Sequence, residues 1–355
     1  MKRPHGLRIL AVLAALLGMM VAACGGPAEN TNSGAAAEPS ATASGDTANA
    51  FPITIQHALG TTTIEKKPER VVTVNWANHE VPLALGVVPL GMAKANFGDD
   101  DDDGLLPWVK KRLEELGAQP PVLFDENDGI DFEAVADLQP DVILAAYSGL
   151  TKQDYETLSE IAPTVAYPDA PWATPWREVI RMNSKALGLA AEGEKLIADI
   201  EAQITAVVDK YPQIKGKSVM FLSHVDPNDV SQIGFYTTHD TRTLFFEDLG
   251  MKIADSVAEA SKGTDQFFLS RSAEQADYFA DVDIITGYGD DKGELLDKIS
   301  KDPLWSKIPA IQRGSVYLLP GSTPLSTAAN PTPLAIGWVL EDYVKALAEA
   351  ADKVK

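Results

Sequence analysis

The chain has 355 residues, with 51 acidic and 30 basic side chains that give a formal net charge of −21. Such an acidic surface repels nucleic acid and anionic lipid, which excludes a nucleic-acid-binding protein. The length suggests two domains or lobes at ~150 residues each. The single cysteine excludes an internal disulfide.

The first 23 residues have the pattern of a secretory signal peptide. Lys2, Arg3 and Arg8 precede an apolar run over 9–21, and the sequence VAAC follows at 21–24. The apolar run is shorter than the ~20 residues of a membrane span. Small residues before Cys24 resemble a bacterial lipobox, which implies cleavage before Cys24, a lipid on its thiol and attachment to the membrane. The alternative is an ordinary signal peptide that contains a cysteine.

Cleavage before Cys24 removes three cations and no acidic residue, so the net charge moves from −21 to −24. Residues 24–50 are small and polar and include no large apolar side chain. A segment of this composition buries too little surface to offset its ordering entropy. We therefore predict a flexible tether over 24–50.

The predicted N-terminal lobe spans 51–175. Short β-rich runs over 52–76 end in a compact buried strand at 69–74, and a helical pattern over 77–86 leads to a second strand at 87–93. Residues 131–146 predict a short helix followed by a buried strand. Asp131 is placed as the N-cap of this helix and Glu133 lies in its first turn.

The predicted C-terminal lobe, 213–355, repeats this order. A strand over 217–224 precedes a helix and strand over 241–255 and a capped helix and strand over 272–287. Ser272 and Glu274 correspond to Asp131 and Glu133. Alternating strands and helices predict an α/β fold with two Rossmann-like lobes and mainly parallel sheets.

The segment between the lobes favours a stiff connection. Residues 176–211 contain no proline and only two glycines, and Ile197, Ile200 and Ile204 recur at helical spacing. We predict one long rigid helix over 176–212 and therefore limited closure of the lobes.

Six segments of the body occur in the order found in a known family: 68–91, 131–150, 155–167, 235–251, 302–319 and 333–350. With these segments the body resembles the iron-siderophore substrate-binding proteins of bacterial ABC importers, the helical-backbone class III of periplasmic binding proteins. This resemblance implies a monomeric binding protein outside the cytoplasm, without enzymatic activity or cofactor. It also implies that a ferric siderophore is captured between the lobes and passed to a permease with its ATPase.

Ligands of α/β lobes bind beyond the carboxyl ends of the strands. A ferric siderophore needs aromatic walls and a few charged donors. Arg242 is the principal candidate because its guanidinium offers forked donors to iron-bound oxygens; the alternative is a salt bridge to Asp240 or Glu247. The further candidates in these loops are Trp76, Asn78, Asn96, Phe97, Tyr147, Trp172, Trp176, His224, Tyr236, His239 and Tyr288.

Each aromatic candidate could instead be a core residue at the edge of a lobe. We assign Trp305 and Trp338, which lie in amphipathic helical segments, to the core. For Glu133 and Glu274, the resemblance implies contacts with arginines of the permease. Their alternative role is to stabilise the start of a helix, worth ~0.3–1 kcal/mol each.

Other ligands and activities have weaker support. The run Asp99–Asp103 lacks the spacing of a calcium loop and is predicted to be a solvated loop. Four histidines in the body, without a histidine-rich loop, argue against a bare-metal site. We find no catalytic signature. Haem, cobalamin and a ligand-sensing lipoprotein remain alternatives.

Overall fold

The computed structural model describes residues 50–290 and 292–354. Cys24, the predicted leader and the predicted tether up to residue 49 lie outside the described residues. Among the helices of the described ranges, none combines the length and apolarity needed to cross a membrane.

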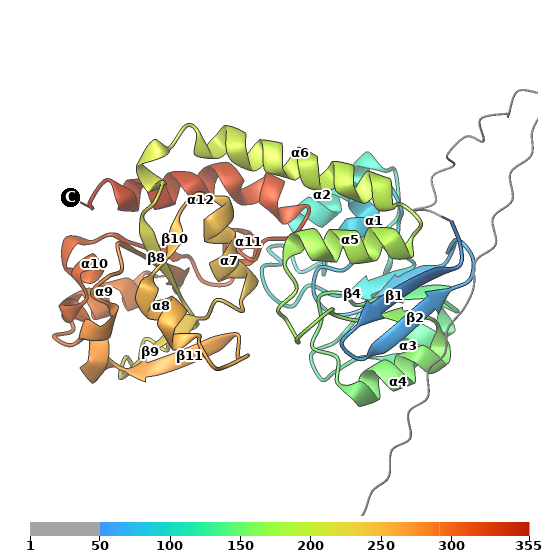
Figure 1. The fold of residues 1–355 in the computed structure, drawn as a ribbon, viewed down its shortest axis with the longest axis horizontal. Coiled ribbons are helices and arrows are strands. Elements are labelled where there is room, and N and C mark those ends of the chain that lie inside the picture. Colours follow the sequence, from blue (N-terminus) through green and yellow to red (C-terminus); the bar gives the residue numbers. More distant parts are fainter. Residues whose placement is uncertain (1–49, 291, 355) are drawn as a thin grey trace, which may run out of the picture. The chain divides into compact units, whose positions relative to one another are not determined.

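The N-terminal lobe contains an antiparallel hairpin, β1 (Ile53–His57) and β2 (Gly60–Ile64), and a parallel sheet in the order β5-β4-β3-β6-β7 (Figure 1). The strand order reverses between β3 and β6, which is where ligands bind in open α/β sheets. The strands of the sheet and their helices are β3 (Val71–Thr73), β4 (Gly91–Ala93), β5 (Val122–Phe124), β6 (Val142–Leu144), β7 (Thr164–Val165), α1 (Glu80–Ala84), α2 (Pro107–Glu115), α3 (Phe132–Asp137) and α4 (Lys152–Ile161).

The C-terminal lobe has a mixed sheet in the order β11-β9-β8-β12-β13, with β10 beside the start of β8. The strands β8, β10, β12 and β13 are parallel, whereas β9 and β11 are antiparallel additions. Its elements are β8 (Ser218–Leu222), β9 (Gln232–Tyr236), α7 (Thr241–Asp248), β10 (Lys252–Ile253), α8 (Asp255–Ala260), β11 (Phe268–Ser272), η3 (Ala273–Phe279), β12 (Ile284–Tyr288), α9 (Glu294–Lys301), η4 (Trp305–Lys307), α10 (Pro309–Arg313), β13 (Val316–Leu319), α11 (Pro324–Ala328) and α12 (Ala335–Ala351).

The two lobes repeat one local plan, as the sequence predicts. Asp141 precedes β6, and its Oδ2 accepts hydrogen bonds from the backbone N–H groups of Glu69 and Arg70 at 3.0 and 3.2 Å. Asp283 precedes β12, and its Oδ2 accepts from the N–H of Ser218 at 3.0 Å. In both lobes the aspartate ties the start of this strand to the start of the neighbouring parallel strand.

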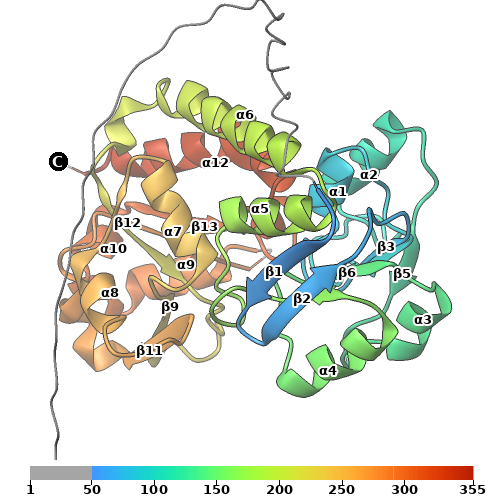
Figure 2. The same ribbon diagram turned by 45° about the vertical axis from the view of Figure 1, so that its right-hand side comes forward.

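The predicted single helix over 176–212 is wrong in one respect. The segment forms α5 (Trp176–Ala186), α6 (Ala190–Val208) and the short η2 (Pro212–Ile214). Gly188 has a φ of 68°, which ends α5 because this left-handed conformation costs glycine little. The connection to the second lobe is α6, which runs beside α12 in both views (Figures 1 and 2).

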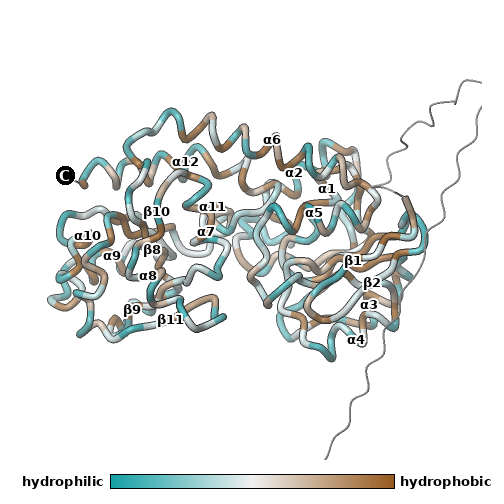
Figure 3. Tube along the Cα trace, in the orientation of Figure 1, coloured by the Kyte–Doolittle hydropathy of each residue, from teal (hydrophilic) through white to brown (hydrophobic). Residues whose placement is uncertain are grey.

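The apolar core continues from one lobe to the other beneath α6 and α12. One cluster of buried side chains includes Trp108 from the N-terminal lobe, Ile200 from α6 and Val344 from α12. The strands are largely brown in Figure 3, while the helices alternate brown and teal, as expected for helices with one buried face. This shared core favours limited movement of one lobe against the other.

The two tryptophans assigned to the core differ. Trp305 is fully buried, and its indole N–H donates to the carbonyl of Val230 at 2.8 Å. The prediction for Trp338 is wrong, because this side chain is 42% exposed. Trp338 lies on α12, outside the helix face on which Tyr343 is buried. Its ring contacts the ring of Trp108, with the two centroids 5.3 Å apart.

Candidate functional site

The loops after β3 and β6 are tied together at the reversal point of the N-terminal sheet. Asn78 is fully buried, and its amide donates to the carbonyls of Val74 and Tyr147, both at 2.8 Å. Its side-chain oxygen accepts from the N–H of Tyr147 at 3.0 Å. These hydrogen bonds position the backbone of Tyr147. Asn78 therefore has a structural role in the site.

The aromatic side chains of this lobe include Tyr147 and Trp172, whose rings meet edge to face at 5.5 Å. Trp172 has a φ of 60°, an uncommon conformation for a bulky residue. A Cβ added to Gly149 would lie 2.3 Å from Nε1 of Trp172, so only glycine lets the indole approach this closely. Trp76, after β3, is partly buried against the same core.

At the reversal point of the C-terminal sheet, His224 follows β8 and Tyr288 ends β12. Their rings stack at 4.2 Å with an interplanar angle of 5°. Phe97, from the loop after β4 in the other lobe, meets both rings edge to face, at 5.9 and 6.0 Å. Burial, and next the charge of Arg242, lower the pKa of His224, so this imidazole is neutral near pH 7.

Arg242 lies among these aromatic residues, at the start of α7. Its Nε and Nη2 donate to the carboxylate of Asp240 at 2.8 and 2.6 Å, and Nη1 donates to the Tyr288 hydroxyl at 3.2 Å. The guanidinium carbon is 3.9 Å from the centroid of the Tyr236 ring, within the range of a cation–π contact. The side chain is 13% exposed. Burial opposes its charge, but Asp240 and Tyr288 outweigh burial and raise the pKa of Arg242.

The two lobes meet at Tyr147. Its hydroxyl is 3.4 Å from Oγ1 of Thr241, and the side-chain amide of Asn330 donates to it at 3.3 Å. A cavity of about 280 Å³ borders Phe97, and its lining includes Asn96 and Phe97 from one lobe and Ser322 from the other. The predicted residues form two groups of contacts, Tyr147 with Trp172, and Phe97, His224, Tyr236, Arg242 and Tyr288 with one another. Thr241, which approaches the Tyr147 hydroxyl and precedes Arg242 in the chain, joins the two groups. We call these seven predicted residues the cleft cluster.

Two predicted ligand contacts lie elsewhere. Trp176 is 3% exposed, and its indole N–H donates to Asp248 on α7 at 2.9 Å, which makes it part of the contact between the lobes. His239 borders a separate cavity of about 630 Å³ whose other lining residues belong to 238 and 258–265. The structure does not place either side chain in the cleft cluster.

Sequence reasoning missed three neighbours of the cleft cluster. Phe267 stacks on Tyr236 with ring centroids 6.4 Å apart. Asn330 accepts a hydrogen bond from Thr241 at 2.9 Å as well as donating to Tyr147. Asn75 accepts from the N–H of Gly149, which packs against Trp172, at 3.1 Å, and its φ of 59° turns the chain after β3. None of these carries a local signal, because each depends on contacts distant in sequence.

The docking candidates Glu133 and Glu274 are both exposed near the start of a helical segment. Their predicted caps are present, because Asp131 accepts from the N–H of Ala134 at 3.0 Å and Ser272 from that of Glu274 at 3.3 Å. The second segment, η3, is a 3₁₀ helix. Neither carboxylate forms a hydrogen bond or ion pair within the described ranges, so both are available at the surface.

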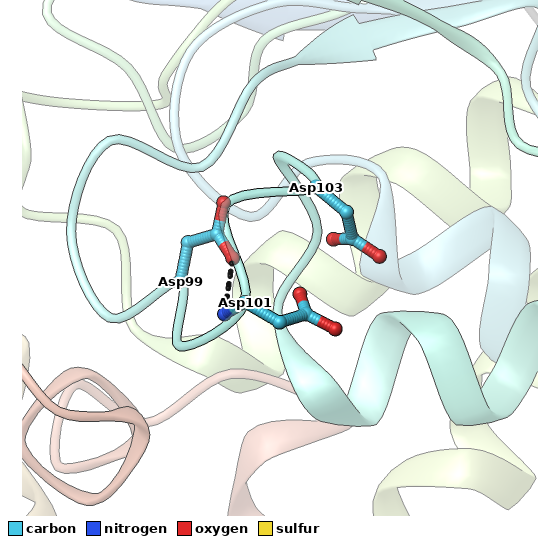
Figure 4. Close-up of side chains that lie close together, drawn as sticks. All are labelled: Asp99, Asp101 and Asp103. Carbon is cyan, nitrogen blue, oxygen red and sulfur yellow. Dashed lines mark hydrogen bonds between the residues drawn. The ribbon is translucent and has the colours of Figure 1, made fainter.

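The acidic run forms a surface loop, as predicted. Asp99, Asp101 and Asp103 approach one another in Figure 4. Lys110 donates to Asp101 and Asp103 at 2.5 and 2.6 Å, and Asp99 accepts from the N–H groups of Asp101 and Gly104. The lysine and the backbone donors already satisfy these carboxylates.

The imidazole of His79 lines the same small cavity as Trp76 and is buried, and neither ring nitrogen has a hydrogen-bond partner in the part of the chain that the structure describes. Burial lowers the pKa of His79 from 6.5 to about 4. Between pH 4 and pH 6.5, His79 is therefore protonated in the unfolded chain and neutral in the folded chain. The stability that comes from keeping His79 neutral is present above pH 6.5 and is lost as the pH falls towards 4.

We expect wild-type protein to lose roughly 2 kcal/mol more stability than a His79→Leu variant between about pH 7 and about pH 5. Urea unfolding of both proteins at each pH measures the difference, which also cancels the effect of the neighbouring buried Glu80. Equal pH dependence in the two proteins would contradict the assignment.

Two α/β lobes with reversed strand order, a helical connection and an aromatic cluster between them define a two-lobed solute-binding protein. A family model described as periplasmic binding protein matches residues 71–323, and the chain belongs to this family. The expected resemblance to substrate-binding proteins of ABC importers is confirmed.

Individual relatives agree with this family. The crystal structure of PiaA from Streptococcus pneumoniae in complex with ferrichrome is 45% identical, with a TM-score of 0.81 over 85% of this chain and 100% of that chain. The probable siderophore-binding lipoprotein YfiY of Bacillus subtilis is 26% identical over 274 residues, 74% of this chain and 79% of its own. The Fe(3+) dicitrate-binding periplasmic protein FecB of Escherichia coli is 24% identical over 291 residues, 78% of this chain and 84% of its own.

Proposed function

We propose that this chain captures a ferric siderophore in the cleft cluster and delivers it to an ABC permease. The observation that carries the proposal is the buried, charged Arg242 in contact with Tyr236 and Tyr288, with Tyr147 of the other lobe beside the adjacent Thr241. Aromatic walls supply apolar contact, and the guanidinium supplies donors to iron-bound oxygens. The relatives named for siderophores, ferric citrate and ferrichrome support the same ligand class.

We further propose that the mature protein is a monomer held outside the cytoplasm by a lipid on Cys24. The lipobox-like sequence at 21–24 and the lipoprotein names of several relatives support this anchor. Glu133 and Glu274, one exposed on each lobe, would orient the protein on the permease. A binding role requires no cofactor and no chemical step, which is consistent with a family of binding proteins.

Tryptophan-fluorescence titration of the body from Phe51 onward tests the ligand class. Trp76 and Trp172 belong to the same core as the cleft cluster, so a ferric ligand bound there would quench their emission. We expect saturable quenching by a ferric siderophore at submicromolar concentration and little by its iron-free form. Quenching only by haem, cobalamin or a bare metal would overturn the ligand class, and quenching by none would favour a sensor or another function.

A further inference from the structure

The carboxylate of Asp240 is held in place by the residue that it neutralises. Asp240 is the N-cap of α7 and is 0% exposed. Its Oδ1 accepts from both the backbone N–H of Arg242, at 2.9 Å, and Nε of Arg242, at 2.8 Å, while Oδ2 accepts from Nη2 at 2.6 Å. These three hydrogen bonds fix the carboxylate beside the guanidinium.

Asp240 balances the charge of Arg242 in the cleft cluster. Burial raises the pKa of Tyr147 and of Tyr236, so both phenols are uncharged near pH 7, and His224 is neutral. Of the described residues that contact the guanidinium of Arg242, Asp240 is the one that carries a formal charge, and the two charges cancel. A guanidinium has five N–H donors. Two of them serve Asp240 and one serves Tyr288, which leaves two for a ligand.

We propose that Asp240 makes this cleft selective for ferric complexes without net charge, such as those of tris-hydroxamate siderophores. This inference rests on the proposed function. Three hydroxamates, each a monoanion, balance a ferric ion, whereas three catecholates, each a dianion, leave a trianion. A neutral complex needs only the two remaining donors of Arg242, whereas a trianion must lose its hydration without a net positive charge to compensate.

A series of three variants changes the charge of the cleft while keeping side chains of similar shape. Asp240→Asn leaves the charge of Arg242 unbalanced, and asparagine remains a good N-cap. Arg242→Gln leaves the charge of Asp240 unbalanced, and the double variant removes both charges. Glu247→Gln is the matched control, because it changes the same charge at an exposed position of the same helix. Melting temperatures confirm that each protein is folded.

The measured quantity is the ratio of affinities for a ferric tris-catecholate and a ferric tris-hydroxamate. We expect wild type, Glu247→Gln and the double variant to favour the neutral complex to a similar degree. Asp240→Asn should shift the ratio towards the trianion at least tenfold, and Arg242→Gln should shift it the other way. The return of the double variant to the wild-type ratio separates charge selection from a merely structural role.

Several results would overturn the proposal. Wild type that prefers the trianion, or a ratio that is the same in Asp240→Asn and wild type, rejects charge selection while leaving ferric-siderophore binding in place. If Asp240→Asn does not fold, the double variant provides the test. A double variant whose affinity ratio differs from wild type in the same way as that of Arg242→Gln also rejects charge selection. Wild type that binds neither complex rejects the proposed function itself.

Discussion

Arg242→Ala is expected to weaken binding of the ferric siderophore at least tenfold, the scale of one charged hydrogen bond at ~1.5–3 kcal/mol. The variant also leaves the carboxylate of Asp240 buried without its partner. Breaking a buried ion pair in this way costs ~3–5 kcal/mol of folding stability. Fluorescence titration measures the first effect, and urea unfolding measures the second.

Arg271→Ala is the matched control for this variant. Arg271 also lies over a tyrosine ring, that of Tyr278, at 3.7 Å, but it belongs to β11 outside the cleft cluster. The Arg271→Ala variant should keep wild-type affinity, because it also removes an arginine stacked on a tyrosine but leaves the cleft cluster unchanged. Wild-type affinity in a folded Arg242→Ala protein would remove Arg242 from the binding site.

Replacing Glu133 and Glu274 together by alanine should abolish siderophore-dependent iron uptake and leave ligand affinity unchanged. Both carboxylates are exposed, and neither forms a hydrogen bond or an ion pair with another described residue. Two separated charges orient a docking partner and speed its encounter more than they add affinity. Uptake of radioactive iron by cells that depend on this protein measures the effect.

The control for uptake is a double variant that combines Glu114→Ala and Glu349→Ala. These exposed glutamates lie on α2 and α12, so they give the same loss of charge away from the proposed docking positions. This pair should transport normally. Normal uptake by the Glu133 and Glu274 variant, at equal protein level, would remove the docking role.

The fold was predictable from local patterns. Alternating apolar strands and capped helices repeat in both halves, and Asp141 and Asp283 occupy matching positions that sequence shows directly. The break between α5 and α6 was missed because Gly188 can occupy a helix, and only its φ of 68° marks the turn. Trp338 was misassigned because α12 is apolar on much of its circumference, so spacing alone did not identify the buried face.

The candidate site was partly predictable because parallel strands end at one edge of a sheet. That rule found Tyr147, His224 and Tyr288. It could not tell that Trp176 bonds to Asp248, since that contact joins residues of different lobes. It also could not choose between ligand binding and ion pairing for Arg242. The geometry shows a third possibility, in which Asp240 takes two donors and leaves others free.

An anomalous-difference map of the crystalline complex with a ferric siderophore tests the central claim most directly, because it locates the iron itself. We predict one strong iron peak between the lobes, with Arg242 and Tyr288 on one side and Tyr147 and Trp172 on the other. An iron peak at Asp99–Asp103, or anywhere away from the cleft cluster, would contradict this account.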